Sequence, residues 1–172
     1  MASVEDIGID LGSSNVIIAE RGKGVVMNEP AVLAVNHDTR NIISIGLEAY
    51  KMIGREPGGI SVVRPLQKGT IQDFDMLSIM LNYLVVRVSG KHFFNRPRAL
   101  ISISATANEI EKRQLILGML ESGVRRTQIL ERPLAAALGA GIPVNEVTGR
   151  MVVDIGGATT DIAVISSGEI MA

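Results

Sequence analysis

The chain has 172 residues, a length that suits one domain, or one domain with part of a second. Its 17 Lys and Arg nearly balance its 18 Asp and Glu, and a formal charge of -1 excludes the basic surface that non-specific nucleic-acid binding needs. The absence of cysteine excludes disulfides, thiolate metal sites and cysteine nucleophiles. The two histidines are too few for a histidine-rich metal site.

The hydropathy pattern predicts the cell compartment in which the protein is found. The most apolar stretch, residues 133–144, contains Gly and Pro and is too short to cross a bilayer. The first ten residues are acidic and lack a basic region, so we expect no signal peptide. With an apolar fraction of 47%, the composition predicts a soluble cytoplasmic α/β protein with a sizeable packed core.

The first third of the chain is predicted to consist mainly of short strands. Apolar, β-branched runs are separated by turns rich in Gly, Asn and Asp, which is typical of antiparallel hairpins. The expected elements are a meander of strands at 7–11, 16–20 and 25–28, a hairpin of 31–35 with 41–45, a short helix at 47–53 and a strand at 60–63.

Two amphipathic helices are predicted further along. In residues 75–88 the apolar side chains recur at spacings of three and four, and Asp73 or Asp75 can cap the first turn. Residues 108–122 form the second helix, which Gly123 closes.

Strands alternate with helices after residue 75, which predicts parallel crossovers and therefore a mixed sheet. A Gly- and Pro-containing segment at 139–149 is the candidate boundary between two units. The remaining expected elements are strands at 99–103 and 127–130, a helix at 133–138, strands at 151–155 and 161–165, and a strand starting at 169–171.

The most informative feature is a pattern that occurs twice, as Ile-Asp-Leu-Gly-Ser-Ser-Asn at 9–15 and as Val-Asp-Ile-Gly-Gly-Ala-Thr at 153–159. Small residues in a turn let backbone N–H groups converge on a phosphate. The preceding Asp10 and Asp154 can hold a hydrated Mg²⁺. Two such turns facing each other would clamp a triphosphate, whereas the alternative is two ordinary hairpins with Asp and Gly supplying turn chemistry.

This pattern gives a set of candidate site residues. Other phosphate loops do not fit, because no Gly-x-Gly-x-x-Gly and no Gly-x-x-x-x-Gly-Lys-[Ser/Thr] is present. The candidate nucleotide-binding residues are Asp10, Gly12, Ser13, Ser14, Asn15, Asp154, Gly156, Gly157, Ala158 and Thr159, with Asp10 and Asp154 as the candidate magnesium residues.

Taken together, several segments resemble the MreB family, the bacterial actin-like cell-shape proteins of the actin/Hsp70/sugar-kinase superfamily. They follow the family's order over nearly the whole chain. The segments are residues 6–12, 22–30, 52–58 and 151–157, with shorter matches at 64–65, 73–74, 96–98 and 133–137. The resemblance implies ATP and Mg²⁺ as ligands of the two turns.

The resemblance also implies a fold. The expected class is α/β, a mixed-sheet ribonuclease H-like domain of the actin-like ATPase kind. Residues 1–144 would form domain I, with subdomain IA at 1–31 and 66–144 and an inserted subdomain IB at 32–65. Residues 145–172 would begin a truncated domain II, as strands without a sheet of their own. Because the adenosine-binding segment of the family is then absent, we expect weak ATP affinity.

Two positions depart from the family pattern. The catalytic segment of the family reads acidic-Glu-Pro, whereas this chain has Glu131-Arg132-Pro133. A guanidinium cannot act as a general base, which leaves Glu131, together with Thr159, as the catalytic candidate. Ala158 stands where a third glycine is usual. We therefore expect impaired hydrolysis.

A membrane contact is predicted at residues 92–94, His-Phe-Phe, which Lys91 and Arg96 flank. Adjacent aromatic side chains with neighbouring cations suit a shallow membrane anchor, and MreB relatives use a hydrophobic loop in this region. The alternative is that one of Phe93 and Phe94 packs inward.

The leading hypothesis is an MreB-like cytoskeletal module that forms or modulates membrane-associated filaments. Its expected partners are its own copies or full-length MreB-like subunits, the cytoplasmic face of the inner membrane and, by resemblance, the cell-wall elongation machinery. No nucleic-acid partner is expected. One alternative is an active ATPase or phosphotransferase of the sugar-kinase type. Another is an interaction module that binds no nucleotide.

Overall fold

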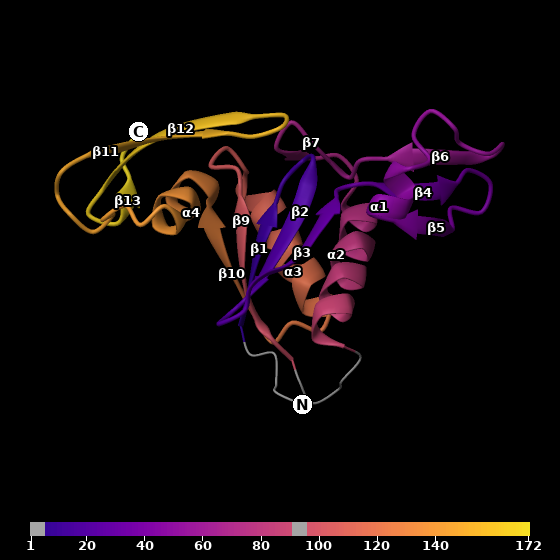
Figure 1. The fold of residues 1–172 in the computed structure, drawn as a ribbon, viewed down its shortest axis with the longest axis horizontal. Helices are drawn as coiled ribbons and strands as arrows, with labels where there is room; N and C mark the ends of the chain where they lie inside the picture. Colours follow the sequence, from indigo (N-terminus) through magenta and orange to yellow (C-terminus); the bar gives the residue numbers. More distant parts are fainter. Residues whose placement is uncertain (1–5, 91–95) are drawn as a thin grey trace.

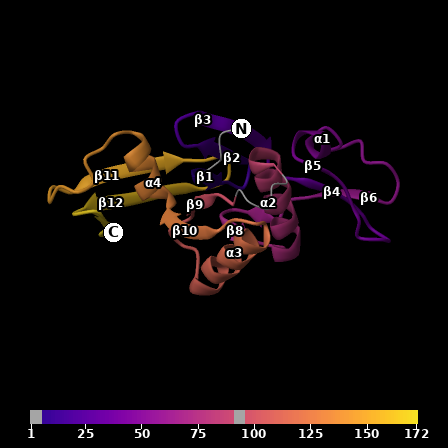
Figure 2. The ribbon, with the colours of Figure 1, turned by 90° about the horizontal axis from the view of Figure 1, so that it is seen from below.

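The computed structural model describes residues 6–90 and 96–172. A central five-stranded sheet carries two smaller three-stranded sheets at its opposite ends (Figure 1). Viewed from below, two helices cover the central sheet between these two ends (Figure 2). The α/β class with a mixed sheet is therefore confirmed.

The central sheet has the strand order β10-β9-β1-β2-β3. β1, β2 and β3 pair antiparallel as the predicted meander, whereas β9 pairs parallel with β1 and with β10. The sheet is thus mixed, as the alternation of strands and helices predicted. Its strands are β1 (Asp6–Leu11), β2 (Asn15–Glu20), β3 (Gly24–Pro30), β9 (Arg98–Ile103) and β10 (Arg126–Glu131).

Two helices cover one face of this sheet, namely α2 (Phe74–Ser89) and α3 (Glu109–Glu121). The side chain of Asp73 caps α2, and Asn108 forms a capping box at the start of α3. Because side chains alternate along a strand, every second residue of β1, β2 and β9 enters the core. The buried strand residues are Ile7, Ile9, Leu11, Val16, Ile18, Ala99, Ile101 and Ile103.

A second sheet lies within residues 32–65 and has the order β5-β4-β6. Its small core contains Val32, Ala34 and Ala49. The predicted helix at 47–53 is shorter in the structure. The elements of this segment are β4 (Leu33–Asn36), β5 (Ile42–Ile45), α1 (Leu47–Tyr50) and β6 (Ile60–Val63).

The third sheet corrects the expectation that residues 145–172 lack a sheet of their own. Its order is β11-β12-β13, and α4 (Arg132–Gly139) buries one of its faces. Ala137 of the helix packs with Val152 and Ile165 of the strands, so the segment has its own small core. The strands are β11 (Arg150–Ile155), β12 (Thr160–Ser166) and β13 (Glu169–Ile170).

A short hairpin that the sequence did not predict joins the second sheet to α2. It consists of β7 (Leu66–Gln67) and β8 (Thr70–Ile71), with Lys68 and Gly69 at its turn. Both turn residues have positive φ angles, 49° and 77°. Among the helices that the structure describes, none is long and apolar enough to cross a membrane.

Candidate functional site

The repeated sequence pattern is also a repeated backbone turn. The N–H of Gly12 donates to the carbonyl oxygen of Asn15 at 3.1 Å, and the N–H of Gly156 donates to that of Thr159 at 2.8 Å. Each turn connects a pair of antiparallel strands, β1 with β2 and β11 with β12. The two segments, whose glycines are 144 residues apart in the chain, therefore present the same turn.

The two turns contact each other. The tip of the β11–β12 hairpin lies beside the ends of β1 and β2 (Figure 1). A Cβ atom built on Gly157 would collide with Ser14 Oγ and would lie 3.1 Å from Ser14 Cβ. A side chain at position 157 would therefore require Ser14 to move. The fold thus places the two candidate turns opposite each other.

The unpredicted β7–β8 hairpin braces both turns. The N–H of Gly69 donates to Ser13 Oγ at 3.0 Å, and Arg64 Nη1 donates to the carbonyl oxygen of Ser13 at 3.4 Å. A Cβ atom on Gly69 would lie 3.4 Å from the methyl group of Thr159. The local signal for this hairpin in the sequence is the glycine after Lys68, which is too weak to predict two strands of two residues.

A cleft of about 340 Å³ opens on the face of the central sheet that α2 and α3 leave uncovered. Its floor includes Leu130, Ser102 and Asp10, which are neighbours across β10, β9 and β1 in the sheet register. Ser102 Oγ donates to Asp10 Oδ1 at 2.6 Å. Asp154 of β11 lines the same cleft. Both candidate aspartates therefore face one space.

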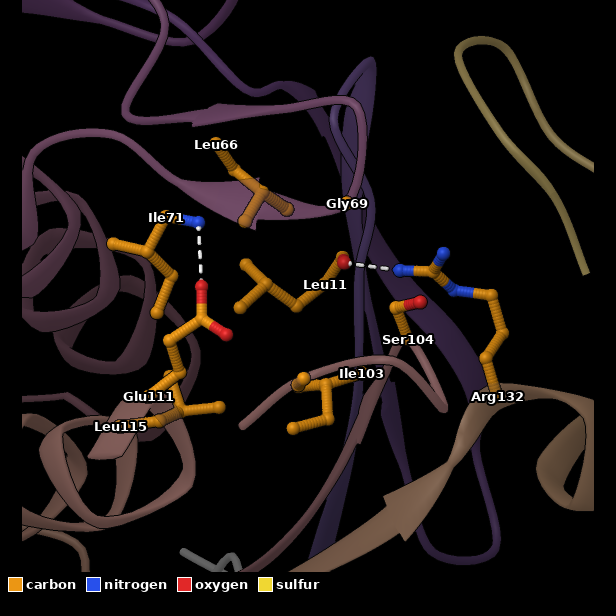
Figure 3. Close-up of a pocket in the computed structure, with 10 residues that line it drawn as sticks. Leu11, Leu66, Gly69, Ile71, Ile103, Ser104, Glu111, Leu115 and Arg132 are labelled. Atoms are coloured by element: carbon orange, nitrogen blue, oxygen red, sulfur yellow. Dashed lines mark hydrogen bonds between the residues drawn. The ribbon is translucent and has the colours of Figure 1, made fainter. Parts of the chain in front are cut away.

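Arg132 is the cation of this cleft. Its Nη2 donates to the carbonyl oxygen of Leu11 at 2.7 Å, as Figure 3 shows. Its Nη1 lies 3.4 Å from Asp161 Oδ2 and 3.5 Å from Thr159 Oγ1. Its Nε lies 3.7 Å from Asp10 Oδ1. One side chain thereby connects both hairpins.

Behind Arg132 lies a second, much smaller cavity of about 10 Å³ (Figure 3). Its walls are mostly apolar and include Leu66 and Leu115, while Glu111 Oε1 accepts a hydrogen bond from the N–H of Ile71 at 3.2 Å. Such a volume holds at most one water molecule. This cavity belongs to the packing of the core and is not a ligand site.

The catalytic candidates lie on different sides of the cleft. Glu131 does not line it, and its carboxylate lies 4.0 Å from Lys112 Nζ on α3. Thr159 lies at the turn, within reach of Arg132. Neighbouring strand residues point to opposite faces, which separates Glu131 from Arg132.

The remaining residues predicted from the sequence are Asn15, Ala158, Phe93 and Phe94. The side chain of Asn15 donates to Asn28 Oδ1 at 2.7 Å and so supports the start of β2. Ala158 is exposed at the turn. Phe93 and Phe94 lie outside the described residues.

The residues of the cleft do not fit a resident magnesium ion. Within residues 6–90 and 96–172, no three Asp, Glu or His side chains gather as a metal site. Asp10 accepts the hydroxyl proton of Ser102 and faces the guanidinium of Arg132. Both contacts are to Oδ1 of Asp10, so this oxygen is already engaged in the free protein.

Comparison with known proteins agrees with this geometry. The family model for MreB/Mbl protein matches residues 4–172. The cell shape-determining protein Mbl of Bacillus cereus is 44% identical, over 96% of this chain and 50% of its own. The crystal structure of MreB5 of Spiroplasma citri bound to ADP is 37% identical with a TM-score of 0.87, and the match covers 96% of this chain and 50% of that one.

A more distant neighbour, the MamK double helical filament, has a TM-score of 0.77 at 21% identity, over 96% of this chain and 53% of that one, and shows the fold alone. The chain spans about half the length of the curated relatives it matches. The predicted family and the actin-like fold are confirmed, and the chain belongs to the MreB/Mbl family.

Proposed function

We propose that the cleft binds the phosphates of an adenine nucleotide between the β1–β2 turn and the β11–β12 turn. The observation that carries the proposal is the contact of two equivalent turns at Ser14 and Gly157. Since Gly12 and Gly156 use their N–H groups to close the turns, the donors offered to a phosphate come from residues 13–14 and 157–159. The ADP described for Spiroplasma citri MreB5 supports this choice of ligand.

Calorimetric titration with ADP tests the proposal. We expect weak but saturable binding, because the contacts that the two turns offer are to the phosphates. Gly157→Val, which pushes the second turn away from Ser14, should weaken ADP binding, whereas Asp38→Ala, an exposed residue of the β4–β5 hairpin, should leave it unchanged. A wild-type chain that gives no binding heat would contradict the proposal and favour the interaction module without nucleotide.

The same site is proposed to be impaired in hydrolysis. Arg132 lines the cleft where the family carries an acid, and Glu131 lies near Lys112 instead. A guanidinium cannot take a proton from water. Phosphate release from ATP should stay at the buffer background. Release that Asp154→Ala abolishes would favour the alternative, an active ATPase or phosphotransferase.

We propose the predicted domain division for the sheets described above. Subdomain IA would comprise 1–31 and 66–144, subdomain IB would comprise 32–65, and residues 145–172 would begin domain II. The three separate sheets support this division. Limited proteolysis should cut first within residues 140–149, which join α4 to β11.

At the level of the cell, we propose that the chain forms or modulates filaments with its own copies or with full-length MreB-like subunits, close to the cell-wall elongation machinery. The description of the relative Mbl as a cell shape-determining protein supports the proposal. Co-sedimentation with a full-length MreB-like protein tests it. The chain should appear in the pellet only when that protein polymerises.

A contact with the cytoplasmic face of the inner membrane through Phe93 and Phe94 stays a prediction. In the sequence, Arg96 and Arg98 follow these two residues closely, and Lys91 precedes them. Vesicles with anionic lipid should bind the wild-type chain, and the variant Phe93→Ser/Phe94→Ser should lose binding. Equal binding of both proteins would remove the membrane contact from the proposal.

A further inference from the structure

We propose that the guanidinium of Arg132 takes the place of the divalent cation between the two turns, so that nucleotide binding by this chain does not require Mg²⁺. The inference rests on the nucleotide cleft proposed above. It assigns a role to the residue at which the chain departs most from the MreB family pattern.

The position of Arg132 is set by the backbone. It is the first residue of α4, directly after β10, and Pro133 follows it at a helix position that proline favours. Only 12% of its side chain is exposed. The side chain reaches the carbonyl oxygen of Leu11, just before the first turn, and the carboxylate of Asp161, just after the second. Arg132 therefore occupies the space between the turns.

The charges around Arg132 are those that would otherwise attract a metal ion. Asp10 and Asp161 both lie within 4 Å of its nitrogen atoms. A guanidinium is permanently charged and offers five N–H donors in one plane. A hydrated Mg²⁺ at Asp10 would place a second cation beside this fixed charge, and like charges at such a distance repel. Asp10 therefore already has a cationic neighbour in the free protein.

Two serines of the central sheet region hold the carboxylates in place without a metal. Ser102 Oγ donates to Asp10 at 2.6 Å, and Ser104 Oγ donates to Asp161 Oδ1 at 3.3 Å. The carboxylates therefore keep their orientation toward Arg132 in the free protein. Arginine also binds phosphate well, through paired N–H donors. Arg132 can thus offer N–H donors to a bound phosphate at the place where the two carboxylates already hold its charge.

The test compares nucleotide affinity with and without a divalent cation. Fluorescence titration with mant-ADP is carried out on the full chain in Mg²⁺ and in excess EDTA. The variants are Arg132→Glu and the control Arg113→Glu, which makes the same charge change on the exposed side of α3. In EDTA the affinity of the wild type and of the control should change by less than about threefold, whereas Arg132→Glu should lose at least about tenfold.

A wild-type affinity that falls about tenfold or more in EDTA overturns the inference. If mant-ADP binds in neither buffer, the nucleotide proposal fails instead, and Mn²⁺ titration followed by electron paramagnetic resonance decides the inference alone. The neutral variant Arg132→Gln, which adds no carboxylate ligand, should then bind Mn²⁺ more tightly than the wild type, and equal binding, including none in either protein, overturns it. Circular dichroism checks folding, and Arg132→Gln replaces Arg132→Glu if the latter is unfolded.

Discussion

The β1–β2 and β11–β12 hairpins start from nearly the same residues and end in different surroundings. Both carry an aspartate one residue before the end of the first strand, and both close the turn with a hydrogen bond from glycine. The first hairpin lies inside a five-stranded sheet, between β9 and β3. The second lies in a three-stranded sheet with β11 at its edge.

The difference is clearest in the aliphatic side chains. Ile9 and Ile18 of the first hairpin are buried under α2 and α3. In β11, Val152 is buried against α4, while Val153 and Ile155 on the other face are exposed. Apolar residues on both faces of a strand are typical of sheets that are covered on both sides. The shared pattern determines the turn, whereas the neighbouring layers determine the burial.

The largest expected effect contrasts the two hairpins directly. Ile18 is fully buried and Ile155 is 78% exposed. Ile18→Ala should lower the free energy of unfolding by about 2–5 kcal/mol, because it leaves a cavity. Ile155→Ala should change it by no more than about 0.5 kcal/mol. Urea unfolding of both variants measures the contrast, and equal losses would show that the second sheet is covered in solution.

The next effect concerns the connection between the hairpins. Arg132→Met keeps an unbranched, apolar stem and removes the bonds to Leu11 and Asp161. It should destabilise the chain by about 1–3 kcal/mol, because it leaves a nearly buried carboxylate without its cation. Hydrogen exchange should rise in β11–β12 and stay unchanged in β1–β2. An equal rise in the hydrogen-exchange rates of both hairpins would mean that Arg132 does not connect them.

A smaller effect is expected where the turns touch. Gly157→Ala adds a methyl group that collides with Ser14, at a cost of about 1 kcal/mol in unfolding free energy. Ser14→Gly in the same chain should restore most of this loss, since it removes the colliding atoms. Thermal unfolding of the two single variants and the double variant gives the coupling free energy between positions 14 and 157. Additive losses would indicate that the turns lie apart in solution.

The smallest effect distinguishes the far ends of the hairpins. The side chains of Arg98 and Arg21 donate to Asp6 and hold the pKa of its carboxyl below its ordinary value of 3.8. The equivalent position in β11 is Arg150, whose partner Glu146 is exposed. Stabilisation by Asp6 is therefore complete above pH 3.8 and is lost as the pH falls through the lowered pKa.

Thermal unfolding across acidic pH measures this effect. Wild type should be slightly more stable than Asp6→Asn near neutral pH, and the difference should vanish in strong acid. Arg150→Gln should show no such dependence on pH. A constant difference between wild type and Asp6→Asn down to strong acid would contradict the assignment.

Much of the fold follows from local signals. The apolar spacing and the caps at Asp73 and Asn108 predicted α2 and α3 to within a residue or two at each end. The β7–β8 hairpin escaped prediction because strands of two residues carry no periodicity. The prediction for the third sheet was wrong because the core of this sheet includes Ala137 of α4. The sequence pattern of the strands does not indicate that a helix on the other side of a Gly- and Pro-containing connection packs against them.

By itself, the sequence determined the two aspartate turns, the helices and the family, since each depends on residues close together in the chain. Tertiary structure alone decided that Ser14 meets Gly157 and that Arg132 joins Leu11 to Asp161. Such contacts arise when separate layers pack, and their partners lie too far apart in the chain for local propensity to encode them.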